Sequence, residues 1–381
     1  MRGEASGTGR IGFAWGAVLA LGVGLLGGGV QGCVAAPLQA PSASGAVHPA
    51  GEVSANTLFV MIQGDARIAL VDMDALEVRE VIELSELGFG ARSMPHHVAV
   101  SPRGDHWYVS LIGENRVLRF DPENRITGSF EMETPGMLSL TPSGRRLAVS
   151  RSMSAVNPPA RIGFVDPGEG IPVEVDVLFP RPHGIVVDGD GRYAYTASLG
   201  LNQIASVDLE TERVEIVDVP GPTHAFVQLA LSPDGSTLVA TGEMSGELVA
   251  FDLTDPARPR PAASIQVGPQ AFDPAFHPRD GTVWVPIKGA DEIAIVDPNG
   301  WTVTRRIDGA GLSQPHAISF SPDGSRAFVT NNAADPGLRA GSSAGSEGAA
   351  ALVVVNTATL EIEATLELGR NLTGLGSRPE S

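Results

Sequence analysis

Three histidines occupy one equivalent place in a repeated pattern, each directly after a proline: Pro95-His96, Pro182-His183 and Pro315-His316. Each stands five residues before a Gly-containing turn, and His97 adjoins the first of them. His224 lies three residues upstream of the corresponding place in its own repeat. Neutral imidazole is a ligand for Cu, Zn, Fe and Ni. The pattern therefore raises the hypothesis of a Cu or Zn site formed by His96, His183, His316 and His224.

The alternative is that Pro-His is a turn whose imidazole hydrogen-bonds a neighbouring repeat. The remaining repeats carry Gly136, Val227, and Phe272 or Asp273 at the equivalent place. The histidines therefore come from separated repeats, and their spacing alone does not make the site compact.

The turns that follow these positions show how the chain is organised. They begin at Ser101, Thr141, Asp188, Ser232, His277 and Ser321, which are 40, 47, 44, 45 and 44 residues apart. A short apolar run precedes each turn and three further runs of four to six residues follow it, separated by Gly, Asp, Asn and Pro. A four-stranded unit of this period is typical of a β-propeller blade. Tandem β-sandwiches would need about 100 residues per unit.

Six full repeats leave one blade to be completed. Leu58–Gln63, Ile68–Asp72 and Val78–Leu84 supply three of its strands, and we expect the inner strand from the C-terminal residues Asn371–Leu375. The sequence thus predicts an all-β, seven-bladed propeller over residues 57–375, closed by both chain ends. Val47–Ala50 is an alternative inner strand. Residues 376–381 are then a short tail.

The last turn carries a resemblance to a known family. Ser321-Pro322-Asp323-Gly324, followed after two residues by Ala327-Phe328-Val329-Thr330-Asn331, resembles the YVTN family of seven-bladed propellers, across about residues 57–375. The resemblance implies the fold. It does not imply an activity, because the family includes surface-layer proteins and cofactor-binding domains as well as other proteins.

In such a propeller the first strand of each blade lines the central channel, and the loops between second and third strands open on the same face. We expect a binding face there that includes His97, Glu114, Asn202, Glu243, Lys288 and Asn332, among other loop residues such as Gln63. Lys288 is the single lysine beside 25 arginines, although a solvated loop cation would also explain it. Two longer loops, Ser152–Ala160 and Asn332–Ala350, lie on this face.

Composition excludes several classes of protein. The formal net charge is −18 and no basic stripe is present, which argues against a nucleic-acid partner. The single cysteine, Cys33, cannot form an intrachain disulfide or a Cys-based zinc site.

The N-terminus reads as an export signal. Arg2 and Arg10 precede an apolar stretch, Ile11–Leu26, and the run ends in Gln31-Gly32-Cys33. This resembles a bacterial lipobox, so we expect a signal peptide over residues 1–32, diacylglycerol on Cys33 and a flexible tether over 33–56. The predicted location is the cell envelope, lipid-anchored on the periplasmic side or in the outer membrane. Cleavage after Ala36, or a single membrane span, are the alternatives.

These features favour a monomeric, non-catalytic propeller that binds an unknown small ligand or an envelope protein. A His-liganded metal or redox-cofactor protein is the second hypothesis. A lactonase-like hydrolase, with carboxylates and His97 or His183 in acid–base roles, is the third. No nucleophile elbow, His-Glu-x-x-His motif or P-loop occurs in the sequence.

Substitution of the lipidated residue tests the predicted anchor. Cys33→Ser removes the only thiol that could carry diacylglycerol, so the variant should leave the membrane fraction and lack the acyl mass. Fractionation with mass spectrometry measures both. A variant that stays with the membrane, beside a wild type without acyl mass, would refute the lipobox interpretation.

Overall fold

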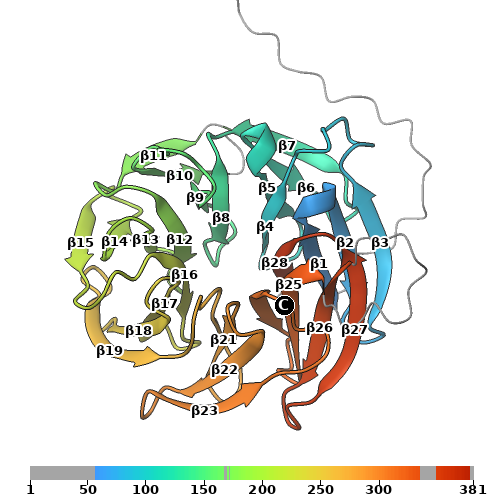
Figure 1. The fold of residues 1–381 in the computed structure, drawn as a ribbon. Coiled ribbons are helices and arrows are strands. Elements are labelled where there is room, and N and C mark those ends of the chain that lie inside the picture. The colour runs from blue at the N-terminus through green and yellow to red at the C-terminus, as the bar shows by residue number, and fades with distance from the viewer. Residues whose placement is uncertain (1–55, 167–169, 171, 335–348, 378–381) are drawn as a thin grey trace, which may run out of the picture. The chain divides into compact units, whose positions relative to one another are not determined.

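Seven four-stranded antiparallel sheets form a ring in the computed structural model, which describes residues 56–166, 170, 172–334 and 349–377 (Figure 1). The chain folds as a seven-bladed β-propeller, as the repeats predict. Cys33, the signal segment and Val47–Ala50 lie outside the described residues, as does most of the Asn332–Ala350 loop. Among the described residues, no helix has the length and apolar character needed to cross a bilayer.

The strands of each blade run from the channel outward. Blade 1 contains β28 (Leu372–Ser377), β1 (Thr57–Ile62), β2 (Arg67–Asp72) and β3 (Glu77–Glu83). Blade 2 contains β4 (Pro95–Val100), β5 (Trp107–Leu111), β6 (Arg116–Phe120) and β7 (Ile126–Glu131). Blade 3 contains β8 (Pro135–Leu140), β9 (Leu147–Arg151), β10 (Arg161–Val165) and β11 (Val173–Asp176). Blade 4 contains β12 (Pro182–Val187), β13 (Tyr193–Ser198), β14 (Gln203–Asp208) and β15 (Val214–Asp218).

The remaining three blades follow the same order. Blade 5 contains β16 (Phe226–Leu231), β17 (Thr237–Gly242), β18 (Glu247–Asp252) and β19 (Arg260–Gln266). Blade 6 contains β20 (Ala275–Phe276), β21 (Val283–Ile287), β22 (Glu292–Asp297) and β23 (Thr302–Ile307). Blade 7 contains β24 (Pro315–Phe320), β25 (Arg326–Ala334), β26 (Ala350–Asn356) and β27 (Ile362–Gly369). Single-turn 3-10 helices η1 (Gln63–Asp65) and η2 (Ile112–Glu114) follow β1 and β5.

Hydrogen bonds between residues of the same turn stabilise the Ser-Pro-Asp-Gly turns. In the turn before β17, the Ser232 hydroxyl donates to Asp234 Oδ1 at 2.6 Å, and the Thr237 amide donates back to that hydroxyl at 2.9 Å. Gly235 has φ 70°, a left-handed conformation that suits glycine. Its amide donates to the Ser232 carbonyl at 2.8 Å. Each such turn connects the inner strand of a blade to its second strand and reverses the chain direction between them.

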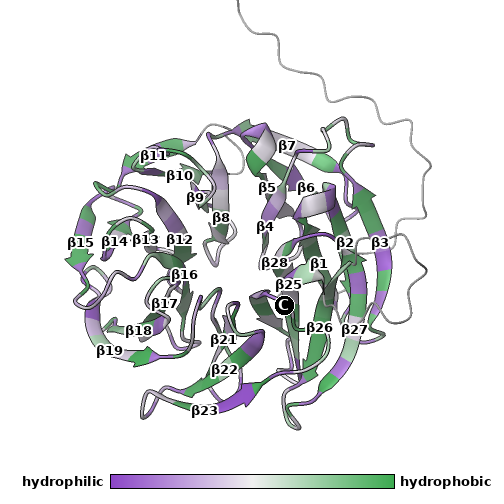
Figure 2. Ribbon diagram, viewed as in Figure 1, coloured by the Kyte–Doolittle hydropathy of each residue, from purple (hydrophilic) through white to green (hydrophobic). Residues whose placement is uncertain are grey.

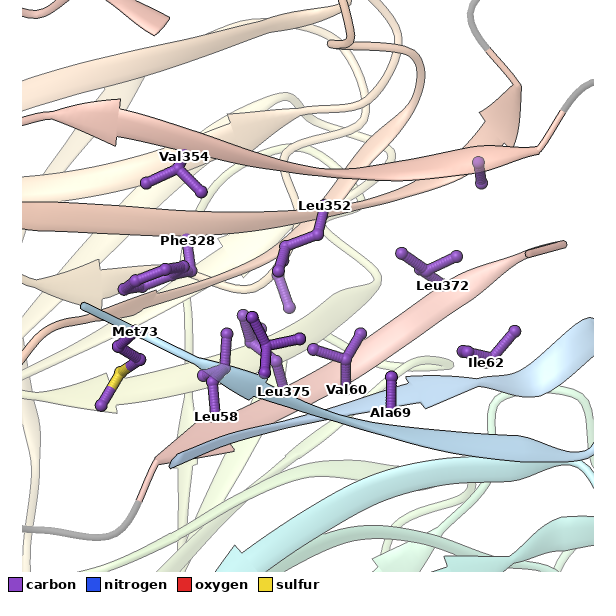
Figure 3. Close-up of a cluster of buried hydrophobic side chains, with 13 residues drawn as sticks. Leu58, Val60, Ile62, Ala69, Met73, Phe328, Leu352, Val354, Leu372 and Leu375 are labelled. Carbon is purple, nitrogen blue, oxygen red and sulfur yellow. The ribbon is translucent and has the colours of Figure 1, made fainter. Parts of the chain in front are cut away.

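Apolar side chains of neighbouring blades pack against each other and hold the ring together. Hydrophobic residues concentrate on the middle strands, whereas outer strands such as β3 and β23 carry many hydrophilic residues (Figure 2). The cluster between blades 7 and 1 includes Phe328 and Leu352 of blade 7 together with Leu372 and Leu375 of β28 (Figure 3). The C-terminal strand is therefore part of the core.

The chain ends close the ring as predicted. β28 pairs antiparallel with β1 and continues two residues beyond Leu375, so that Ser377 faces Leu58. Arg370 reinforces the junction through Asp65, with 2.6 Å between Nε and Oδ1. The pairing removes the two open edges that an incomplete blade would expose.

Truncation tests this closure. Deletion of residues 370–381 removes β28 and the buried Leu372 and Leu375, which contribute roughly 3–6 kcal/mol by burial alone. We expect loss of cooperative unfolding, or aggregation through the exposed edge of β1. Differential scanning calorimetry measures the transition, and an unchanged transition would contradict closure by β28.

Candidate functional site

Every inner strand contains one extra residue near its start, at the end of the channel that we call the channel mouth. In blade 2, for example, Pro95 pairs with Leu111 and Val98 with Val109, so the two residues His96 and His97 oppose the single residue Ser110. The same one-residue excess occurs in all seven blades. Such a bulge re-aims the side chains beside it.

The bulge defines one equivalent residue per blade, directly after the first paired residue. From blade 1 to blade 7 this mouth ring consists of Thr373, His96, Gly136, His183, Val227, Phe272 and His316. The structure thus selects Phe272, rather than Asp273, as the sixth member, and adds Thr373. Histidine alternates with a small residue over blades 7, 1, 2, 3 and 4.

The hydroxyls of the second strands satisfy the amides that the bulge frees. Ser110 accepts from the amide of His97 at 3.1 Å, Ser150 from that of Met137 at 3.0 Å, and Thr330 from that of Ala317 at 3.2 Å. A buried backbone amide needs such a partner. These hydroxyls, including the Thr of the family-like motif, therefore hold the mouth ring in place.

The three Pro-His histidines converge at the channel mouth. The ring centroid of His96 lies 6.2 Å from that of His183 and 6.2 Å from that of His316. All three side chains are buried. Blade 7 lies only two places from blade 2, because blade 1 stands between them. We call this group, His96, His183 and His316, the imidazole arc.

Small residues between the histidines allow this approach. A Cβ on Gly136 would lie 2.6 Å from the carbonyl carbon and oxygen of Arg151. That carbonyl is the hydrogen-bond partner of His183 Nδ1, at 2.8 Å. A side chain at Gly136 would therefore displace the group that orients His183.

Hydrogen bonds fix the orientation of two imidazoles. Nδ1 of His96 lies 2.8 Å from Oε1 of Gln63, and Nδ1 of His183 meets the Arg151 carbonyl. Both partners only accept, so each Nδ1 carries the proton and each Nε2 presents a lone pair. His96 Nε2 is buried without a partner among the described residues, as is His316 Nδ1. Each such atom carries a desolvation cost of about 1–3 kcal/mol.

The imidazoles are held neutral. Burial lowers the pKa of His97 and of His183 to about 4. Burial, followed by the charge of neighbouring histidines, lowers the pKa of His96 and of His316 well below the ordinary value. The imidazole arc therefore presents lone pairs rather than positive charge at neutral pH.

Asp273, Lys288 and Phe272 lie beside the arc at blade 6. Asp273 Oδ2 is 3.9 Å from His316 Nδ1, and the Lys288 ammonium is 4.5 Å from the centroid of the Phe272 ring. Burial raises the pKa of Asp273 to about 7, against the charge of Lys288. Burial lowers the pKa of Lys288, while Glu243 and Asp273 act in the opposite direction.

The other predicted histidines serve local contacts. His97 Nδ1 accepts from the amide of Leu138 in blade 3, at 3.2 Å, so it joins two blades. His224 stacks on Phe226, and its Nδ1 lies 3.0 Å from Ser245 Oγ and its Nε2 3.3 Å from the Pro220 carbonyl. His97 and His224 therefore make hydrogen bonds within the fold, whereas His96, His183 and His316 lie close to one another.

Three predicted face residues are engaged in loop hydrogen bonds. Glu114 accepts from the Gly90 amide at 3.2 Å, and Asn202 donates to the Pro222 carbonyl at 2.6 Å. Asn332 donates to the Leu372 carbonyl at 2.8 Å, across the closure. Glu243 and Lys288 make no side-chain hydrogen bond or ion pair with any residue that the structure describes.

Sequence reasoning did not assign two groups that shape the site. Arg151 is buried at the end of β9, where it donates to the Glu133 carbonyl at 2.6 Å and leaves its own carbonyl for His183. Gln228 accepts from the Ile185 amide at 3.1 Å. An arginine ending the otherwise uncharged strand Leu147–Arg151 was the available signal for the first.

Among the residues the structure covers, no three His, Cys, Asp or Glu side chains stand close enough, as placed, to share a metal ion. With metal–nitrogen bonds of about 2.0–2.1 Å, ring centroids around one ion would be roughly 5–5.5 Å apart. The observed 6.2 Å separations thus exceed that range by about 1 Å.

Comparison with solved structures places the fold among known propellers. The chain is similar to the dihydro-heme d1 dehydrogenase NirN in complex with DHE, with 17% identity and TM-score 0.61 over 88% of this chain and 78% of that one. A functionally unknown protein from Desulfotomaculum acetoxidans shows 12% identity and TM-score 0.67, over 85% and 100%. Streptogramin B lyase shows 15% and 0.60, over 72% and 86%. At these identities the likeness concerns the fold alone. No family model and no curated protein matches the sequence.

Acidification should weaken the fold through the buried histidines. Unfolded histidine takes up a proton near pH 6.5, whereas folded His97 and His183 do so near 4, so stability is complete above pH 6.5 and is lost as pH falls towards 4. Each imidazole contributes about 3 kcal/mol to this loss. Asp273 opposes it, because its folded carboxyl is protonated below pH 7 before the unfolded one.

Urea unfolding of chelator-treated protein between pH 7.5 and 4 measures the effect. His183→Asn should flatten the loss on acidification, and Asp273→Asn should steepen it. Superimposable profiles for all three proteins would show that these groups are not buried as described.

Proposed function

We propose that this chain is an exported, lipid-anchored propeller that acts as a non-catalytic binding module, with its ligand at the channel mouth. One observation carries the proposal: His96 Nε2 and His316 Nδ1 are buried polar atoms without hydrogen-bond partners among the described residues. Buried polar groups are ordinarily satisfied, and exceptions often mark functional sites. A ligand that supplies the missing partners accounts for two otherwise costly groups at one place.

The surroundings of the arc suit ligand binding. The apolar members Val227 and Phe272 contact Leu199 and Met153, so imidazoles occupy one side of the mouth ring and hydrocarbon the other. Pockets that combine apolar walls with a few oriented polar groups are typical of small-molecule sites. The bulges place the three imidazoles and Val227 on strands rather than on loops, which favours a preformed site.

A metal ion or a metal-bearing cofactor is the second candidate, and the orientation of His96 and His183 favours it. Metal-bound histidine usually donates its other ring N–H to a carbonyl or carboxylate. Gln63 and the Arg151 carbonyl are placed for this role, which leaves Nε2 of each ring for the ion. An all-imidazole donor set suits Cu or Zn. Binding of one ion would require the centroid separation within each pair of rings to shorten by about 1 Å.

Loss of one imidazole tests both candidates. Native mass spectrometry of protein purified from the cell envelope should detect a non-covalent ligand on the wild type and its loss from His96→Ala. Elemental analysis, and titration with Cu²⁺ and Zn²⁺, then decide whether that ligand is a metal, expected at one per chain. His224→Ala is the matched control, because both nitrogens of this buried ring have partners within the protein.

A wild-type protein with neither a bound ligand nor affinity for these ions would overturn the proposal. So would a ligand retained in full by His96→Ala.

A further inference from the structure

A second row of equivalent residues, which we call the rim row, surrounds the mouth ring. In each blade, a residue at the channel-mouth end of the second strand donates its amide to the carbonyl of the residue directly before the first paired residue of the inner segment. Gln63 donates in this way to Asn371, and Lys288 to Gln270. The row consists of Gln63, Ile112, Ser152, Leu199, Glu243, Lys288 and Asn332. Gln63 of blade 1 and Lys288 of blade 6 are therefore equivalent positions.

This equivalence explains why His316 has an unpartnered nitrogen. His96 donates its Nδ1 proton to Gln63, the rim residue of the preceding blade. The blade that precedes His316 carries Lys288 at that position, and an ammonium has donors but no acceptor. Nδ1 of His316 consequently lacks the acceptor that His96 has.

The groups around Lys288 do not replace the missing acceptor. Asp273 Oδ2 stands 3.9 Å from His316 Nδ1, beyond hydrogen-bond distance. Lys288 itself lies over the Phe272 ring and has no carboxylate within ion-pair distance among the residues described. The Lys288 ammonium and the unpartnered Nδ1 of His316 thus share one corner of the channel mouth. Asp273 and Glu243 are near enough to raise the pKa of Lys288, but neither carboxylate is within hydrogen-bond distance of either nitrogen.

Apolar side chains adjoin this corner. Leu199, Val227 and Phe272 pack together beneath it. Leu201 and Met244 are 45% and 71% exposed on the neighbouring β13–β14 and β17–β18 loops, which open on the same face. A ligand with one anionic end and an apolar body matches this arrangement of donors and hydrocarbon.

We propose that Lys288 and the Nδ1–H of His316 together bind a carboxylate group whose apolar body lies over Phe272 and the neighbouring blades 4 and 5. The carboxylate oxygen takes the place that Gln63 Oε1 occupies beside His96. The inference rests on the proposed function, since it names the class of ligand that the channel mouth accepts: a small amphiphilic carboxylate.

Paired probes that differ only in charge test this site. 2-Naphthoate and the neutral 2-naphthamide share one apolar body, and isothermal titration of the purified exported protein measures both. We expect naphthoate to bind at least ten-fold more tightly than the amide. Lys288→Met should remove that preference, and Lys288→Arg should retain it within about three-fold, because the cation is kept.

Two further variants separate charge from fold. Lys288→Gln should also abolish the preference for naphthoate, but it should raise the midpoint of thermal unfolding, because glutamine supplies His316 with the acceptor that Gln63 gives His96. Arg305→Met is the charge-matched control on the exposed face of β23 in the same blade, and should leave both affinities unchanged.

Three outcomes would overturn the site: no binding of naphthoate by the wild type, equal binding of acid and amide, or an undiminished preference in Lys288→Met. Failure here is distinguishable from failure of the proposed function. If the ligand that copurifies with the wild type is lost from His96→Ala but Lys288→Met keeps the naphthoate preference, only the carboxylate site is wrong.

Discussion

The pairing of β28 with β1 is the interaction on which the rest of the structure depends. It completes blade 1 and buries Leu372 and Leu375 between the first and last blades. It also places Thr373 in the mouth ring between His316 and His96. The Thr330 hydroxyl donates to the Thr373 carbonyl at 2.6 Å, and the Thr373 hydroxyl to the His96 carbonyl at 3.0 Å. Blades 7, 1 and 2 are thereby joined at the channel mouth, so closure of the ring places His316 beside His96.

Backbone geometry and side-chain volume have separate roles in forming the imidazole arc. The bulge directs one residue per blade toward the axis. Because histidine alternates with a small residue over blades 7, 1, 2, 3 and 4, the three imidazoles can approach one another. Gly136 and Thr373 leave room for the flanking imidazoles, whereas Val227 and Phe272 fill the other side with hydrocarbon. Low dielectric around the rings keeps them neutral. The result is a channel mouth with the Nε2 lone pairs of His96 and His183 on one side and the Lys288 ammonium on another.

The fold was predictable from the sequence because a propeller repeats its signals. Turn spacing, four short strands per repeat and the incomplete first blade all pointed to seven blades closed by the C-terminus. Blade 6 shows the limit of this reasoning. Its turn is longer, its inner strand is only Ala275–Phe276, and the equivalence of Phe272 emerged only from the pairing of Ala271 with Ile287.

The site was predictable in part. Equal positions in the repeat identified His96, His183 and His316, since equivalent residues of a propeller share one depth in the channel. His224 was outside that register and made local contacts instead. The orienting partners could not be read in the same way, because the Arg151 carbonyl belongs to the backbone and carries no residue signature. Gln63 and Lys288 stand in turns of different length and sequence, so their equivalence required the hydrogen bonds of the folded chain.

The seven bulges separate the backbone of the channel mouth from the side chains that it displays. Each is held by main-chain pairing and, in several blades, by a hydroxyl from the second strand, neither of which involves the side chain at the mouth ring. Gly136 and Thr373 are exceptions, because a Cβ at Gly136 would meet the Arg151 carbonyl and the Thr373 hydroxyl donates to the His96 carbonyl. At the other five positions of the mouth ring, the side chain can change without loss of the backbone contacts that hold the bulge.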